Sequence, residues 1–175
     1  MKMNAVYGFL LMGCLWRPAA PLAAQPATSS AINLLPRYGN APKSAQLLRA
    51  DAAFLAFCDK SFPTRKAAAA HVAARGWDFL RAGEVNTAIK RFNQAWLLDS
   101  THAGAYWGFG AIMGQRQQAG KSLKYLLLSQ RYDSTNKQLL VDLALTRLNL
   151  YAETKQLAEV DRAIADLRRY LADPG

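Results

Sequence analysis

Apolar residues recur three and four positions apart over most of the chain from Ser44 onward, which is the spacing of one face of an α-helix. Short polar or glycine-containing breaks interrupt this pattern, and Ser44 and Thr64 stand as capping residues at two of its starts. Alanine and leucine dominate, whereas β-branched residues are sparse. The pattern therefore predicts an all-α chain of about seven helices and no strand. The expected ranges are 44–60, 64–83, 84–98, 103–117, 119–132, 137–151 and 154–172.

The tripeptide Asp-Ser-Thr occurs at Asp99 and again at Asp133, 34 positions later. This spacing is the length of one helix-turn-helix repeat. Both copies stand where one expected helix ends. Ser100–Thr101 and Ser134–Thr135 are predicted to offer side-chain oxygens to the free amides at the start of the next helix. Each copy would therefore close one repeat.

The stretch from Gly76 to Ser100 resembles the tetratricopeptide repeat family. Gly76 matches the small residue of the first helix, Gly83 the turn glycine and Phe92 the aromatic knob, while Ala88 and Ala95 match the small residues of the second helix. These residue types have a physical reason, because two antiparallel helices approach closely only where Gly or Ala occupies the crossing, and a large ring fills the remaining gap.

Two further units follow the first in phase. The second, 103–136, has Gly110 at the small position but Gln117 at the turn position. The third starts at Lys137, carries several extra residues near 151–155, and places Ala163, Ile164 and Leu167 at pattern positions. The resemblance covers roughly residues 64–174, and it implies a right-handed solenoid of about three repeats. This repeat domain, 64–175, would follow an N-terminal helix within 44–63.

In this family the first helix of each repeat lines a concave groove that binds peptides. Large aromatic anchors with adaptable polar neighbours dominate the energies of such interfaces. An alternative stays open, in which Trp77 and Trp107 simply bury against the neighbouring helix. The family's clamp for C-terminal carboxylates is not expected, because its Lys, Asn and Arg are missing here. Carried over position by position, the resemblance implies a groove lined by Trp77, Arg81, Trp107, Gln115, Asp142, Leu145 and Asn149.

The first 24 residues have the layout of a secretory signal peptide: Lys2 precedes an apolar stretch at 5–16 that is too short to span a bilayer. Two cleavage sites fit. One lies after Ala24, and the other is a lipobox at Leu11–Cys14, in which Cys14 would be lipidated. Either one predicts an extracytoplasmic protein of the periplasm or cell envelope. Residues 25–43 hold several prolines without a sustained period, and they are predicted to form a flexible tether.

Composition excludes several classes of function. Only two histidines occur among the 175 residues, without acids or cysteines at ligand spacing, so neither a metal site nor a catalytic arrangement is expected. The chain carries a net charge of +10, but nucleic-acid binding would require aromatic residues interleaved with the bases on one face, and the predicted leader makes nucleic acid a rare partner, so nucleic acid is not expected. No cofactor is expected, and neither the identity of the partner nor the oligomeric state follows from the sequence.

These observations predict a protein–protein interaction module of the bacterial cell envelope that binds a peptide segment or a helix. A second hypothesis is an immunity- or inhibitor-type protein that blocks a partner enzyme through a basic surface. The second unit favours it, because within 101–136 the bases Arg116, Lys121, Lys124 and Arg131 face the single acid Asp133.

Overall fold

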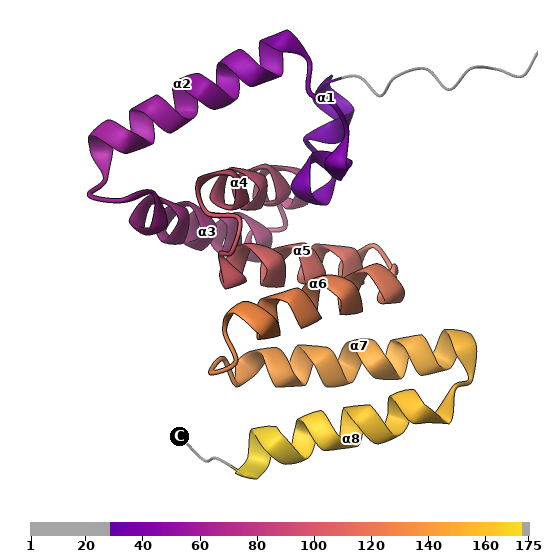
Figure 1. Cartoon of the computed structure of the whole chain (residues 1–175). Helices are drawn as coiled ribbons and strands as arrows, with labels where there is room; N and C mark the ends of the chain where they lie inside the picture. Colours follow the sequence, from indigo (N-terminus) through magenta and orange to yellow (C-terminus); the bar gives the residue numbers. More distant parts are fainter. Residues whose placement is uncertain (1–28, 173–175) are drawn as a thin grey trace, which may run out of the picture.

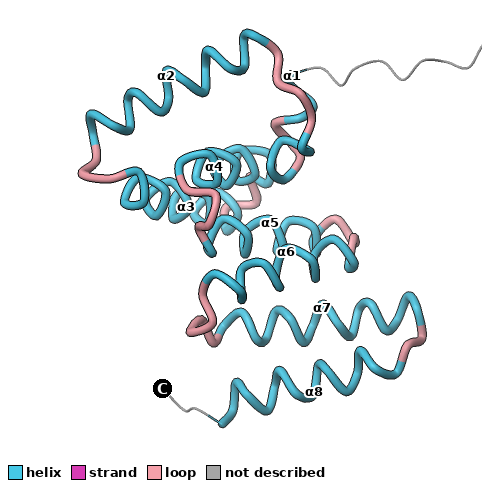
Figure 2. Tube along the Cα trace, viewed as in Figure 1, coloured by secondary structure: helices cyan, strands magenta, loops and turns pink. Residues whose placement is uncertain are grey.

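The computed structural model describes residues 29–172, and throughout this range the regular structure is helical, which confirms the predicted all-α class (Figures 1 and 2). The predicted signal peptide, with its lipobox and Cys14, lies outside the described residues. No described helix is long and apolar enough to cross a membrane. The seven long helices are α2 (Ala45–Ser61), α3 (Arg65–Arg81), α4 (Val85–Leu98), α5 (Ala103–Gln115), α6 (Ala119–Tyr132), α7 (Gln138–Thr154) and α8 (Leu157–Ala172).

The helices pack in consecutive pairs. Helices α3 and α4 form one hairpin, α5 and α6 a second, and α7 and α8 a third. The hairpins stack in chain order because α4 packs against α5 and α6 packs against α7 (Figure 1). The first helices of the hairpins also touch one another, α3 with α5 and α5 with α7, so they lie along one common face of the stack.

Glycines at the helix crossings allow the first two hairpins to close tightly. A Cβ atom on Gly76 would lie 2.7 Å from the Phe92 ring, and one on Gly108 only 2.3 Å from the same ring. In the second hairpin, a Cβ on Gly110 would lie 2.4 Å from Leu126. Phe92 and Leu126 are themselves almost fully buried. The predicted small-residue crossing, filled by one large side chain, is therefore present in both hairpins.

All three hairpin turns use the left-handed backbone conformation, although only one of them has glycine. The φ angles are 79° at Gly83, 56° at Gln117 and 59° at Lys155. Gln117 thus takes the predicted turn position despite the steric cost of its Cβ. The third turn comes later in its unit because α7 has 17 residues where α5 has 13, and this agrees with the extra residues expected near 151–155.

The two Asp-Ser-Thr copies form the same turn, but the predicted roles within it were wrong. Asp99 and Asp133 end α4 and α6 as expected. It is their carboxylates, however, that accept hydrogen bonds, from the backbone N–H of Thr101 and Thr135 at 2.9 Å and from both threonine hydroxyls. The next helix α5 is instead capped by His102, whose Nδ1 accepts from the amide of Ala105 at 3.2 Å.

The predicted tether at 25–43 was also wrong where the structure describes it. Residues 29–40 form α1 (Ser29–Ile32) and the 3-10 turn η1 (Pro36–Asn40), and this segment packs on the stack. The buried Asn93 of α4 donates from Nδ2 to the carbonyls of Asn33 and Leu35 at 3.1 and 2.9 Å. Arg116 donates to the carbonyl of Leu34 at 3.0 Å. These side chains satisfy backbone groups that a solvated tether would leave to water.

The third hairpin departs most from the repeat pattern. The α8 residues that pack against α7 are Glu159, Ala163 and Asp166, all buried. The prediction that Ile164 and Leu167 occupy repeat positions was wrong, because these side chains are 43% and 38% exposed. Of the three expected positions only Ala163 is buried, so helix α8 is turned relative to the orientation that the family pattern implies. Its two inward acids require a buried counter-charge.

That counter-charge is Arg147 of α7. Its guanidinium donates to Glu159 at 2.9 Å and to Asp166 at 3.0 Å, and its side chain is only 11% exposed. Buried charges need such hydrogen-bonded partners, because an unpaired charge in the interior is costly. Arg147 therefore fixes the orientation of α8.

Candidate functional site

Two tryptophans from successive hairpins border an open hollow on the face shared by α3 and α5. Its volume is about 510 Å³. In this article it is called the tryptophan hollow, and it is lined by Ala74, Trp77, Asp78, Arg81 and Trp107.

The two tryptophan rings bridge the core and the surface. Their centroids lie 4.8 Å apart with the planes tilted by 59°. Trp77 also meets Phe92 edge to face, with ring centroids 5.4 Å apart. Both indoles are half-buried. The sequence left open whether these residues belong to the groove or to the core, and the structure places each in both, with one part packed inward and another bordering the hollow.

Asp142 orients one of the tryptophans. The indole Nε1 of Trp107 donates a hydrogen bond to the Asp142 carboxylate at 2.6 Å. This bond crosses from α5 to α7 and satisfies the single polar group of the indole. Asp142, predicted as a groove residue, therefore contributes by holding Trp107 in place, and part of its hydrogen-bonding capacity is already used.

Charged groups form the rim of the hollow on α3. Arg81 donates to Asp78 at 2.7 Å, and Arg75 donates to the same carboxylate at 3.1 Å. Arg81 remains 70% exposed. Because exposed ion pairs of this kind contribute little stability, an incoming carboxylate can compete with Asp78 for the guanidinium group. Two arginines share one acid here, which leaves this rim with a positive charge.

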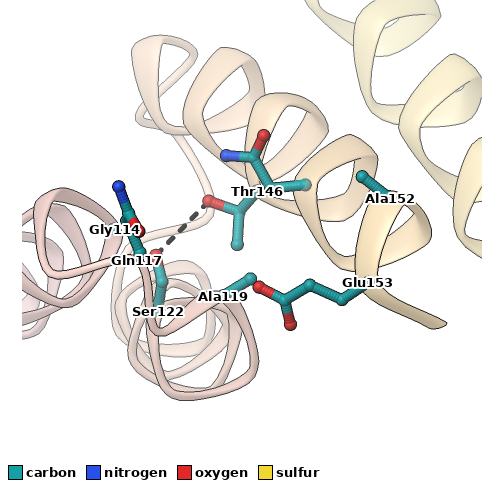
Figure 3. Close-up of a pocket in the computed structure, with 8 residues that line it drawn as sticks. Gly114, Gln117, Ala119, Ser122, Thr146, Ala152 and Glu153 are labelled. Atoms are coloured by element: carbon teal, nitrogen blue, oxygen red, sulfur yellow. Dashed lines mark hydrogen bonds between the residues drawn. The ribbon is translucent and has the colours of Figure 1, made fainter.

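The remaining predicted groove residues lie apart from the tryptophan hollow. Leu145 is 56% exposed on α7, and Gln115 is exposed at the end of α5. Asn149 borders a second hollow of about 300 Å³. This hollow lies between the α5–α6 turn and α7 (Figure 3). The structure thus gathers four of the seven predicted residues, Trp77, Arg81, Trp107 and Asp142, and leaves Gln115, Leu145 and Asn149 outside that group.

Several polar side chains line the second hollow. Ser122 donates to the carbonyl of Gly110 at 2.9 Å, and its oxygen lies 3.3 Å from the hydroxyl of Thr146 (Figure 3). Gln117 and Glu153 approach the hollow from the turn and from α7. The serine hydroxyl already has protein partners, so this hollow offers fewer free polar groups than its composition suggests.

Sequence reasoning missed Ala74 and Asp78 of the tryptophan hollow. Ala74, Trp77, Asp78 and Arg81 are spaced three, one and three positions apart, which is one face of a helix. The signal was therefore available once Trp77 and Arg81 had been chosen. Ala74 matters because its small side chain keeps the hollow open beside the two indoles.

The described chain offers little for covalent chemistry. Within residues 29–172, no three His, Cys, Asp or Glu side chains lie close enough together to hold a metal ion. Cys58 is buried, and burial, together with the nearby charge of Asp59, raises the pKa of its thiol, which keeps it in the unreactive protonated form. His102 is occupied as the cap of α5.

Comparisons with protein-family models, with curated protein sequences and with solved structures find no match to this chain.

Proposed function

We propose that this chain is a tetratricopeptide-like interaction module, a right-handed stack of three helical hairpins that binds an extended peptide segment or a helix of a partner protein. The observation that carries the proposal is the tryptophan hollow, in which indoles from two successive hairpins border one open space. Half-buried tryptophans held by the core are typical anchors of protein interfaces, because they offer a large apolar area at little cost in conformational entropy.

The continuous face of α3, α5 and α7 supports an elongated ligand. These helices touch in succession, so a bound segment can run across them from the tryptophan hollow toward Leu145. The bond from Trp107 to Asp142 ties the second and third hairpins together along this path. Pre-organisation of this kind favours affinity, because fewer side chains have to be ordered on binding.

The chemistry of the hollow suggests what the ligand carries. An apolar or aromatic side chain fits between the indoles. An acidic residue next to it would pair with Arg81, whose present partner Asp78 is exposed. We therefore propose that the preferred segment combines one large apolar anchor with a neighbouring carboxylate. The signal-peptide layout of residues 1–24 supports a partner in the bacterial cell envelope.

A peptide-display selection on the full chain tests this proposal. We expect the enriched peptides to carry an aromatic or large aliphatic anchor beside an acidic residue. Ala74→Arg should then weaken the binding of a selected peptide at least about tenfold by calorimetry, because a long charged side chain would fill the hollow. Lys90→Glu, an exposed change on α4, is the matched control and should change affinity less than about twofold. Equal binding by the Ala74→Arg variant would disprove the site.

A basic surface on α6 supports the immunity- or inhibitor-type function as a second candidate. An open hollow of about 530 Å³ has an apolar floor of leucines and is bordered by Lys124 and Arg131. This surface suits an acidic patch on a partner enzyme. A complex formed there should weaken steeply with salt and with Lys124→Glu, whereas binding at the tryptophan hollow should be less sensitive to salt.

A further inference from the structure

Helix α8 exposes its most apolar side. Its apolar residues follow one another at intervals of three, four, three and four positions. The exposed fractions are 69% for Leu157, 43% for Ile164, 38% for Leu167 and 72% for Leu171, and Val160 is half-buried. This set of five is called the α8 stripe here. Its spacing averages 3.5 residues, which is the heptad pattern of helices that pair along their length.

Within residues 29–172, the packing of α8 leaves the stripe uncovered. The residues that face α7 are Glu159, Ala163 and Asp166, and their mean direction lies about 110° around the helix from that of the stripe. A rotation that buried the stripe against α7 would pull Glu159 and Asp166 away from Arg147. The buried ion pairs therefore hold α8 with its apolar side outward.

We propose that the α8 stripe pairs with the α8 stripe of a second copy of this chain, with the two helices antiparallel. In the register that matches the heptads, Ile164 lies opposite Leu167 of the second copy, and Val160 lies opposite Leu171. The two-fold axis generates each of these residue pairs twice, once in each direction. The same surface of α8 therefore serves as both partners. Burial of exposed leucine and isoleucine side chains drives the association.

Charge complementarity selects the second copy and its direction. Asp161 and Arg168 are both exposed on the edge of the stripe that points away from α7. In the antiparallel register, Asp161 of each copy comes next to Arg168 of the other, so two opposite-charge pairs form at one edge. In a parallel pair, Asp161 would instead lie next to Gln156 and Arg168 next to Ala163 of the other copy, and neither residue offers a counter-charge. Ala163 is also buried against α7.

Sedimentation velocity of the full chain over a range of concentrations tests the proposal. We expect a reversible dimer. Leu167→Arg, which places a charge in the middle of the stripe, should raise the dissociation constant at least about a hundredfold. Ala165→Arg is the matched control, because Ala165 is exposed on another side of the same helix, and it should leave the dimer intact. Circular dichroism and thermal melting establish that both variants remain folded.

Charge reversal tests the register. Asp161→Arg or Arg168→Asp alone should each raise the dissociation constant about tenfold, because both inter-copy pairs become repulsive. The double variant restores opposite charges and should recover the affinity to within about threefold. A folded chain that stays monomeric at all concentrations would overturn the proposal, and the stripe would then bind a different protein. A dimer that survives Leu167→Arg, or single reversals without rescue in the double variant, would also overturn it. These residues lie on α8, so neither outcome bears on the tryptophan hollow.

Discussion

The second helix of each hairpin buries three residues at equivalent positions, but the chemistry of these residues differs between the first two hairpins and the third. The inward positions of the second helix are Ala88, Phe92 and Ala95 in the first hairpin, Ser122, Leu126 and Ser129 in the second, and Glu159, Ala163 and Asp166 in the third. All nine side chains are buried, with the same spacing of four and three residues. The interior thus changes along the chain from apolar, through hydroxyl-bearing, to charged.

The comparison teaches how a repeat backbone can be kept while its stabilising interactions change. In the first hairpin the large Phe92 ring fills the crossing, and small apolar neighbours allow it to fit. In the second, the hydroxyls of Ser122 and Ser129 donate to the carbonyls of Gly110 and Ala103. In the third, the central residue is small, and Arg147 with its two acids fills the space. Close packing and satisfied polar groups are thus alternative solutions at one position.

The largest expected effect comes from removing the buried counter-charge of the third hairpin. Arg147→Met removes the buried partner of Glu159 and Asp166, leaves them only the exposed Arg162 and Arg169 of their own helix, and should lower the free energy of unfolding by about 3–5 kcal/mol. The triple variant Arg147→Met, Glu159→Leu, Asp166→Leu gives the third hairpin an apolar interior like the first, and it should recover most of that loss. Urea denaturation measures both. A cost below about 1 kcal/mol for Arg147→Met would contradict the structural role given to the ion pairs.

A smaller loss is expected from crowding the apolar crossing. Gly108→Ala places a Cβ 2.3 Å from the Phe92 ring, and the displacement of that ring should cost about 1–3 kcal/mol. Gly114→Ala is the matched control in the same helix, because its Cβ would lie at an ordinary 3.5 Å from Ser122. The control should be neutral or stabilising by up to about 1 kcal/mol, through the higher helix propensity of alanine. Equal losses in both variants would mean that the crossing is not tightly packed.

The smallest expected effect is a difference in pH-dependent stability between the two junctions that connect successive hairpins. Burial lowers the pKa of His102 below its usual value, with a further decrease from Lys66 and an opposing effect of Asp99. The unfolded chain therefore takes up the proton first as the pH falls. The stability that neutral His102 contributes is complete above about pH 6.5, and it is lost as the pH falls toward the lower folded-state pKa.

The second junction has Asn136 at the position equivalent to His102, and its Oδ1 accepts from the amide of Leu139 at 3.4 Å. His102→Asn would give the first junction the same four residues, Asp-Ser-Thr-Asn, as the second. This variant should retain a helix cap and lose the decrease in melting temperature between pH 7 and pH 5. If the decrease persists in the variant, the titration belongs to another group.

The helix boundaries could be predicted from the sequence because they depend on local signals. Apolar spacing, Ser44 and Thr64 as caps, and the turn at Gly83 act within a few residues, and the structure places all three as expected. The crossings at Gly76 and Gly110 followed from the same 34-residue spacing. For the site, the resemblance to the repeat family placed Trp77 and Trp107 on the first helices of successive repeats, although the two residues are not equivalent positions.

What could not be predicted depends on contacts between distant residues. The segment at 29–40 looked like a tether because its own composition has no helical period, and the side chains that fix it, Asn93 and Arg116, lie some sixty and eighty positions away along the chain. The orientation of α8 depends on Arg147, which pairs with Asp166. Apolar periodicity alone predicted instead that Ile164 and Leu167 would face inward. Asp142 could be placed on the face, but its bond to Trp107 required three-dimensional coordinates.

The turn made by Asp99 with Thr101 and repeated by Asp133 with Thr135 gives the chain a natural module boundary. A segment cut from one turn to the other begins and ends in the same backbone geometry. Duplicating that segment would lengthen the array by one whole unit without a new linker, which makes this protein a scaffold whose reach can be adjusted by copying.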